Sequence, residues 1–181
     1  GVLNLPSGIA VNSNSGEVYG ANTIFRQIQR FDGEGNHISS WDTLAAMGLT
    51  VDHSDNTVLL TLPGKGKLIR YSADGELLGE IGGEMAFPVD VTVRPSDGRI
   101  FVLNKGGAVD VFSREGEHLA NWYGGAKDPV GDPLRPANRN FGIAVAIDGQ
   151  SVYVSNSGRA HISQFDAEGN RVHDWGEGRS S

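Results

Sequence analysis

One pattern of small, β-branched and aromatic residues recurs four times along this chain of 181 residues. Each copy opens on a short segment of small and β-branched residues, at positions 8–11, 48–51, 90–93 and 142–145. Further on, each copy has an aromatic residue four positions before a glycine and a bulky apolar residue six positions after it. A fixed period of this length indicates a repeat architecture. The aromatic–glycine pairs are Phe31/Gly35, Tyr71/Gly75, Phe112/Gly116 and Phe165/Gly169.

Each repeat predicts four short strands and no helix of useful length. In the first repeat these strands are expected at residues 8–11, 17–22, 27–32 and 37–41. The inner strands are rich in Val, Ile, Tyr and Phe, and Asn, Asp, Ser and Gly fill the turns between strands. Ile38 and Trp41 are both apolar and three positions apart, and the alternation of side chains along a regular strand would put them on opposite faces of the sheet. A bulge, or an early end of the strand, is therefore expected in the fourth strand.

A four-stranded unit of about 40 residues that repeats is typical of a β-propeller blade. We therefore predict an all-β chain, a β-propeller built of four-stranded antiparallel blades with four repeats. Residues 1–181 form a single propeller or partial propeller, and Trp122 and Trp175 are expected to lie buried between blades. The blades are expected at about 1–41, 42–84, 85–123 and 139–177, with an inserted inter-blade loop at 124–140.

These landmarks resemble the NHL-repeat family, whose first strand follows a proline and whose third strand ends in Phe-Asp. The resemblance covers nearly the whole chain and implies the propeller fold. The commonest NHL propellers have six blades, so four repeats imply either a closed ring of four or a portion of a larger propeller. The matching segments are residues 5–11 and 87–93 for the first strand, 99–104 and 151–156 for the second, and 29–32 and 163–166 for the third.

The amino-acid composition argues against several classes of protein. There are 15 Lys and Arg against 22 Asp and Glu, a formal net charge of −7. This balance argues against nucleic acid as a partner, because phosphate binding needs clustered cations. No stretch of 18 apolar residues exists, so no membrane insertion is expected. Cysteine is absent, which excludes disulfides and thiolate chemistry and leaves the localisation unknown.

The expected ligand site lies on one rim. Propellers similar to this one usually bind ligands where the loops before the first strand and between the second and third strands meet. The proline-containing loop at 124–140 falls there and is typical of a functional loop on a rigid scaffold, or alternatively of a stiff linker that covers an open edge. The asparagines of the rim alternatively satisfy only local backbone groups. The ligand-binding residues predicted on this rim are Arg26, Lys67, Asp90, Asn104, Lys105, Lys127, Arg135, Arg139, Asn156, Arg159 and His161.

No catalytic residues and no metal site are predicted, so the sequence favours a protein that is not an enzyme without deciding the question. The amidating lyases, which resemble this fold, hold zinc through histidines near the starts of first strands. The matching positions here are Ser7, Met47, Val89 and Phe141, so the resemblance does not carry zinc over. No cofactor is expected. A calcium ion near Asp90 is the alternative, and a hydrogen bond from that carboxylate to neighbouring backbone is the simpler interpretation.

The leading hypothesis is a non-enzymatic binding or scaffolding module whose loop rim binds a protein, peptide or glycan. One alternative is a propeller lyase or metal-assisted hydrolase whose catalytic residues lie partly on missing blades. Another is a propeller fragment that self-assembles. An open arc of four blades exposes two apolar faces, so we expect self-association or association with further propeller blades.

Overall fold

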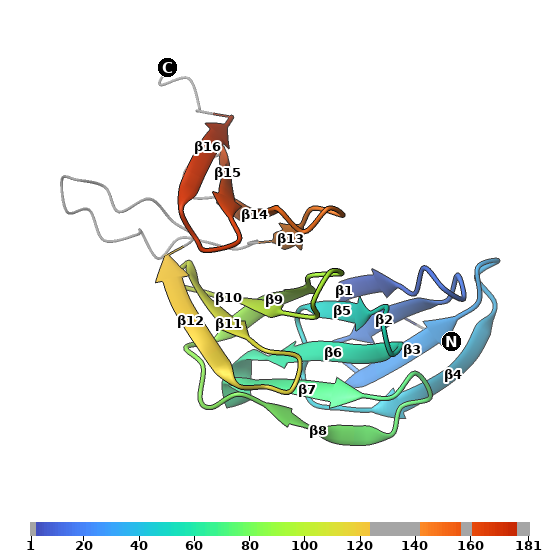
Figure 1. Ribbon diagram of the computed structural model, residues 1–181. Coiled ribbons are helices and arrows are strands. Elements are labelled where there is room, and N and C mark those ends of the chain that lie inside the picture. The colour runs from blue at the N-terminus through green and yellow to red at the C-terminus, as the bar shows by residue number, and fades with distance from the viewer. Residues whose placement is uncertain (1–2, 124–141, 157–160, 177–181) are drawn as a thin grey trace, which may run out of the picture.

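The computed structural model describes residues 3–123, 142–156 and 161–176. They form four antiparallel sheets of four consecutive strands each (Figure 1), which confirms the all-β prediction. We call these sheets blade 1 (β1–β4), blade 2 (β5–β8), blade 3 (β9–β12) and blade 4 (β13–β16). The one helical segment of the described residues is a 3₁₀ turn, η1 (Pro63–Lys65). No helix in those residues has the length and apolar character needed to cross a membrane.

The strands lie within two residues of the positions expected from the sequence. The strands of blade 1 are β1 (Pro6–Val11), β2 (Val18–Asn22), β3 (Gln27–Phe31) and β4 (His37–Asp42). Those of blade 2 are β5 (Leu49–Asp52), β6 (Thr57–Leu62), β7 (Lys67–Tyr71) and β8 (Leu77–Ile81). Those of blade 3 are β9 (Pro88–Val93), β10 (Ile100–Asn104), β11 (Ala108–Phe112) and β12 (His118–Tyr123). Those of blade 4 are β13 (Ile143–Val145), β14 (Ser151–Asn156), β15 (His161–Asp166) and β16 (Arg171–Trp175).

The fourth strand of every blade carries the expected bulge. In blade 1, Phe31 pairs with His37 while Arg30 pairs with Ser39, so Ile38 is the extra residue. The same two-against-one register occurs in the other three blades. A bulge shifts the alternation by one residue, which explains how Ile38 becomes 45% exposed while Trp41 packs on the core.

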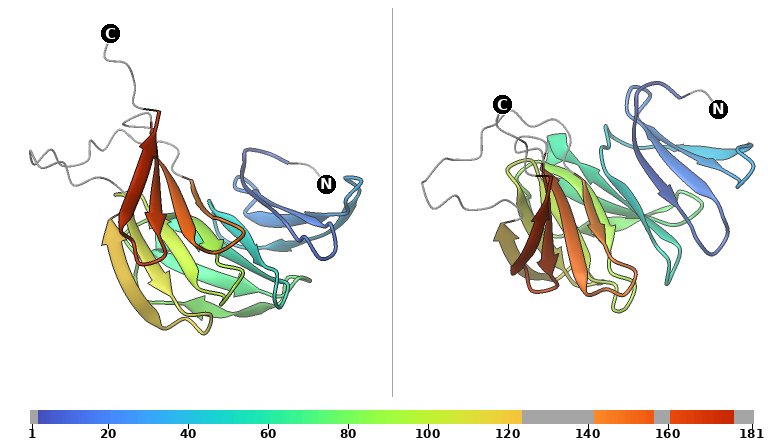
Figure 2. Two further views of the ribbon diagram at one scale, coloured as in Figure 1. Left: turned by 45° about the horizontal axis from the view of Figure 1, so that its top comes forward. Right: turned by 90° about the horizontal axis from the view of Figure 1, so that it is seen from above.

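The core lies between blades rather than within them, because each sheet buries its faces against its neighbours. Tyr19 of blade 1 packs with Leu60 of blade 2, and Phe101 of blade 3 packs with Val152 of blade 4. A third cluster joins blade 2 to blade 3. Figure 2 shows that the four sheets form an open arc, with β1–β4 at one end and β13–β16 at the other. The described blades are therefore arranged as an open arc and not as a closed ring of four.

The two tryptophans expected between blades differ in burial. Trp122 is half-buried and packs into the cluster between blades 3 and 4, with its ring centroid 4.9 Å from that of Phe165. Trp175 is 42% exposed, so the prediction that it is buried was wrong. It lies on the face of blade 4 that points away from blade 3, and no described blade covers this face.

The first strands meet at the crowded inner side of the arc, where β1, β5, β9 and β13 contact one another in that order. Small residues are required there because neighbouring backbones approach closely. A Cβ atom on Gly48 would lie 2.7 Å from Oδ1 of Asp90 and 2.9 Å from the carbonyl oxygen of Val89. At the equivalent place in blade 4, a Cβ atom on Gly142 would lie 3.4 Å from Oγ of Ser155, an ordinary contact.

These two glycines provide a matched test of the inner packing. Gly48→Ala is expected to lower the free energy of unfolding by about 1–3 kcal/mol, because the backbone of blade 3 must shift to admit the methyl group. Gly142→Ala is the control and is expected to cost less than about 1 kcal/mol. Urea unfolding followed by tryptophan fluorescence measures both. Equal losses would contradict the close approach of β5 and β9.

Candidate functional site

The predicted site residues that the structure describes lie on one rim of the arc. The strand registers place the starts of first and third strands beside the ends of second strands. Pro88 pairs with Asn104, Leu62 with Lys67, and Asn156 with His161. Lys105 follows Asn104 directly. We call this edge the loop rim, and its members in the other blades include Arg26 in the turn before β3.

Part of the predicted set lies outside the described residues. This part comprises the inserted loop at 124–140 and the segment before β15, and only the backbone pairing of Asn156 is described. The predicted convergence of cations and amides on one axis therefore remains a prediction. The predicted residues outside the described ranges are Lys127, Arg135, Arg139 and Arg159.

Two of the predicted residues form hydrogen bonds within their own blade. The ammonium group of Lys67 lies 2.9 Å from Glu80, and this hydrogen bond raises the pKa of the lysine. Asn104 is 2% exposed, and its amide nitrogen donates to Asp110 at 2.7 Å and to the carbonyl of Ala108 at 3.3 Å. For Asn104 the structure supports the local role that was the alternative to ligand binding.

Asp90 links blade 3 to blade 4. One oxygen of its carboxylate accepts a hydrogen bond from the backbone N–H of Ile143 at 2.9 Å. Burial raises the pKa of this carboxyl to about 6, against the opposing effect of hydrogen bonds from the backbone of Ile143 and Val91. No group of three or more His, Cys, Asp or Glu side chains in the described residues could hold a metal ion. The carboxylate therefore has the structural role considered from the sequence, and calcium binding stays untested.

Three residues of the rim hold a strained backbone. Leu5 has a φ of 51°, Arg26 a φ of 53° and Phe87 a φ of 64°, in the left-handed region that disfavours residues with a side chain. The turns equivalent to that of Arg26 carry Gly66 and Gly107 at φ angles of 61° and 86°. The repeat alignment could have signalled Arg26, since an arginine stands where two other repeats have glycine.

Exposed apolar side chains, which were not predicted from the sequence, accompany these strained residues. Phe25 is 49% exposed beside Arg26, and Phe87 is 42% exposed. The ammonium group of Lys105 lies 4.9 Å from the ring centroid of Phe87, a cation–π distance. Met47, in the connection before β5, is 40% exposed. The loop rim thus combines exposed apolar side chains with cations.

Two buried polar atoms of the rim have no hydrogen-bond partner within the described ranges. They are Oδ1 of Asn104 and Nε2 of His161. Buried polar atoms are nearly always paired, so Oδ1 of Asn104 can still accept a hydrogen bond, and Nε2 of His161 can accept or donate one, with a group outside those ranges. His161 was predicted as a rim residue, and its ring is half-buried at the start of β15.

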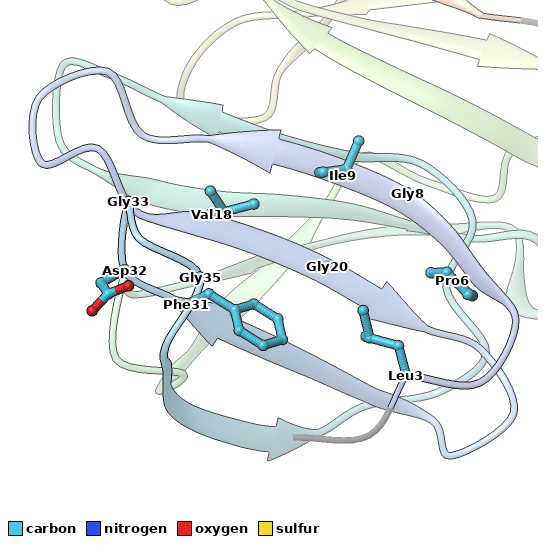
Figure 3. Close-up of a pocket in the computed structure, with 10 residues that line it drawn as sticks. All are labelled: Leu3, Pro6, Gly8, Ile9, Val18, Gly20, Phe31, Asp32, Gly33 and Gly35. Atoms are coloured by element: carbon cyan, nitrogen blue, oxygen red, sulfur yellow. The ribbon is translucent and has the colours of Figure 1, made fainter.

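A separate apolar hollow of about 370 Å³ lies on the free face of blade 1. Figure 3 shows Leu3, Val18 and Phe31 on this face, with Gly35 in the adjoining turn. The lining contains one charged residue, Asp32, whose carboxylate accepts hydrogen bonds from Asn36, and these lower its pKa. The hollow is therefore suited to an apolar group, and it extends along the free face of blade 1 from Pro6, at the loop rim, to the turn at Gly35.

No family model matches the chain, and no curated protein matches it. Solved structures with a propeller-like fold do match. A streptogramin B lyase is 15% identical with a TM-score of 0.71, over 94% of this chain and 54% of that one. The virginiamycin B lyase from Staphylococcus aureus is 18% identical with a TM-score of 0.69, over 92% and 54%. The hydrazine synthase of Kuenenia stuttgartiensis is 14% identical with a TM-score of 0.72, over 96% and 50%. At these identities the likeness shows the fold alone, and the chain spans about half the length of the structures it matches.

Proposed function

We propose that this chain is a non-enzymatic binding or scaffolding module of NHL-type propeller blades, whose loop rim binds a protein or peptide segment. The observation that carries the proposal is the pair Arg26 and Phe87, two exposed side chains held in left-handed backbone. Strained residues persist where the surrounding structure fixes them, and they cluster at sites of function. Glycine would relieve the strain at both positions and would remove both side chains.

The chemistry of the rim favours a peptide over the other ligand classes. Phe25, Met47 and Phe87 offer apolar surface, and Arg26 and Lys105 offer charges that bind carboxylates. A glycan is the other ligand class expected from the sequence, and a screen of both classes distinguishes them. No resident metal or cofactor is part of the proposal.

The NHL assignment belongs to the same proposal. It is supported by the two first strands that begin at a proline, Pro6 and Pro88. The residue before each proline, Leu5 or Phe87, has a left-handed φ of 51° or 64°. The two repeats therefore share an unusual backbone conformation as well as a sequence motif.

The lyase or hydrolase alternative receives less support. The matched lyases are under 20% identical to this chain, and the described residues contain no cluster of metal-binding side chains. The carboxyl of Asp90, near the inner side of the arc, is already hydrogen-bonded to the next blade.

A screen of the purified chain against peptide and glycan arrays, followed by calorimetry of the hits, tests the proposal. We expect a peptide hit whose affinity falls at least about 10-fold in Arg26→Gly, because a hydrogen-bonded charge contributes more than about 1.4 kcal/mol. The same substitution is expected to leave stability unchanged or to raise it by up to about 1 kcal/mol, since the left-handed strain is released.

Two controls locate the site. Arg26→Lys keeps the charge and is expected to keep most of the affinity, whereas Lys105→Ala is expected to weaken binding. Glu117→Gln changes an exposed charge just before the outer strand β12 and is expected to have no effect. Binding that is indifferent to both Arg26→Gly and Lys105→Ala would place the site elsewhere, and a glycan hit without a peptide hit would contradict the ligand class.

A further inference from the structure

Every interface between neighbouring described blades has a contact between the same two repeat positions. The bulky residue at or near the end of each fourth strand covers the hairpin glycine of the following blade. A Cβ atom on Gly75 would lie 2.5 Å from Cδ2 of Trp41, and one on Gly169 would lie 2.6 Å from Cδ1 of Trp122. At these two turns a side chain in place of the glycine would overlap the aromatic ring of the preceding blade. The three pairs are Trp41 over Gly75, Ile81 over Gly116 and Trp122 over Gly169.

Blade 1 carries the receiving half of this interface without an occupant. No described atom comes within 4 Å of a Cβ position on Gly35. The apolar hollow lies at this turn and is lined by Gly35, Phe31, Val18, Ile9 and Leu3 (Figure 3). Ile9 is 72% exposed and Leu3 45%. This face has the volume and the chemistry to take a bulky aromatic side chain.

Blade 4 carries the inserting half without a receiver. Trp175 is 42% exposed, and its ring lies 5.7 Å from Tyr153 and 5.2 Å from His173 between centroids. Ile162, which pairs with Trp175 across the strands, is 45% exposed. In blade 1 the equivalent isoleucine, Ile28, is fully buried against blade 2.

The two open faces also match residue by residue. Tyr71 of blade 2 contacts Trp41 of blade 1 with ring centroids 6.0 Å apart, and Phe31 holds the place of Tyr71 in blade 1. Tyr19 supports Trp41 from within its own blade at 6.1 Å, and Tyr153 holds the place of Tyr19 in blade 4. The Phe31 face and the Trp175 face are thus the two sides of one repeated interface.

Polar groups at the edge of the interface follow the same correspondence. Arg30 lies opposite the tyrosine of β2 and donates to a carboxylate of its own blade and, at 2.5 Å, to Asp74 of the next. Gln164 lies opposite the tyrosine of β14 and donates to Ser151 of its own blade at 2.8 Å. Its amide has a second N–H, and Glu34, just before Gly35, holds the place of Asp74.

We propose that two copies of this chain associate head to tail, with Trp175 of each copy inserted over Gly35 of the other. The interface is heterologous, and two such interfaces close a ring about a two-fold axis. The length fits closure, since the chain aligns at TM-scores of 0.69–0.72 over 92–96% of its length with propeller-like structures of which it spans 50–54%, so two chains supply about the length of one such structure. Two arcs of this kind complete one ring and cover both apolar faces.

Light scattering coupled to size exclusion tests the stoichiometry. We expect a dimer of about 38 kDa, twice the 19.2 kDa of one chain. Trp175→Ala is expected to raise the dissociation constant at least about 30-fold, as truncation of a central interface tryptophan does. Ile9→Glu, which puts a charge into the hollow, is expected to do the same. Leu119→Ala is the control, because Leu119 is 45% exposed but lies at the bulge of blade 3.

Engineered cysteines test the orientation, because the chain has no cysteine of its own. Glu34→Cys and Gln164→Cys are prepared separately, mixed and treated with a bis-maleimide, because the equivalent pair Arg30 and Asp74 is joined through a long side chain and a direct disulfide needs Cα atoms within about 7 Å. We expect a cross-linked dimer in the mixture and none in either variant alone, since only a head-to-tail contact brings these positions together. Cross-linking of either variant with itself would overturn the proposal. A monomer at all concentrations, or an open polymer in place of the dimer, would also overturn it.

Discussion

Replacing Trp122 with alanine is expected to lower the free energy of unfolding by about 3–5 kcal/mol, the range for large aromatic residues of a core. Trp122 packs against Phe165 and Val109 in the cluster between blades 3 and 4, and its ring covers Gly169. Gly169 has no side chain that could fill the space left by the ring. Denaturant unfolding of both proteins, followed by far-ultraviolet circular dichroism, measures the loss.

Trp175→Ala is the matched control for this prediction. The two tryptophans hold the same place in successive blades, but Trp175 is 42% exposed. At protein concentrations where the chain is monomeric, its truncation is expected to cost about 1 kcal/mol, because its ring packs on Tyr153 and His173 of its own blade and no neighbouring blade among the described residues covers it. A loss for Trp122→Ala below about 1 kcal/mol would contradict the packing of blade 3 against blade 4.

The blades were predictable from the sequence because each landmark has a local physical cause. The hairpin glycines, among them Gly35 and Gly116, adopt φ angles of 88° and 97° that few other residues tolerate. The bulge at Ile38 followed from the spacing between Ile38 and Trp41. Strand positions and registers therefore needed only the alternation of side chains and the turn residues.

The burial of Trp175 was not predictable in this way. Its local sequence matches that of Trp122, and its exposure depends on whether another blade covers the face. The rim was predictable only in part for a similar reason. The partner of Lys67 is Glu80, on the neighbouring strand, and Asn104 is engaged by Asp110 six residues along the chain. The residue types predicted a charged and polar rim. Which side chain each of these residues binds is set by strand pairing.

The ionisation of Asp90 is expected to destabilise the folded chain by about 2–3 kcal/mol between pH 4 and pH 7. Burial raises the pKa of this carboxyl from 3.8 to about 6, and a difference of one in pKa corresponds to about 1.4 kcal/mol. Between these two values the folded chain binds more protons at Asp90 than the unfolded chain does. The free energy of unfolding therefore falls as pH rises through this window, and above it the full loss persists.

Asp90→Asn isolates this contribution, because the amide oxygen still accepts the hydrogen bond from Ile143 while the side chain no longer ionises. The variant is expected to gain stability relative to the natural chain as the pH rises from 4 to 7. Asp166→Asn is the control, since hydrogen bonds from Asn170 lower the pKa of Asp166, and its own effect is confined to more acidic solution. Urea unfolding at a series of pH values measures both differences. A stability difference between the natural chain and Asp90→Asn that stays constant from pH 4 to pH 7 would show that the carboxyl is solvated, and the buried contact between β9 and β13 would then be wrong.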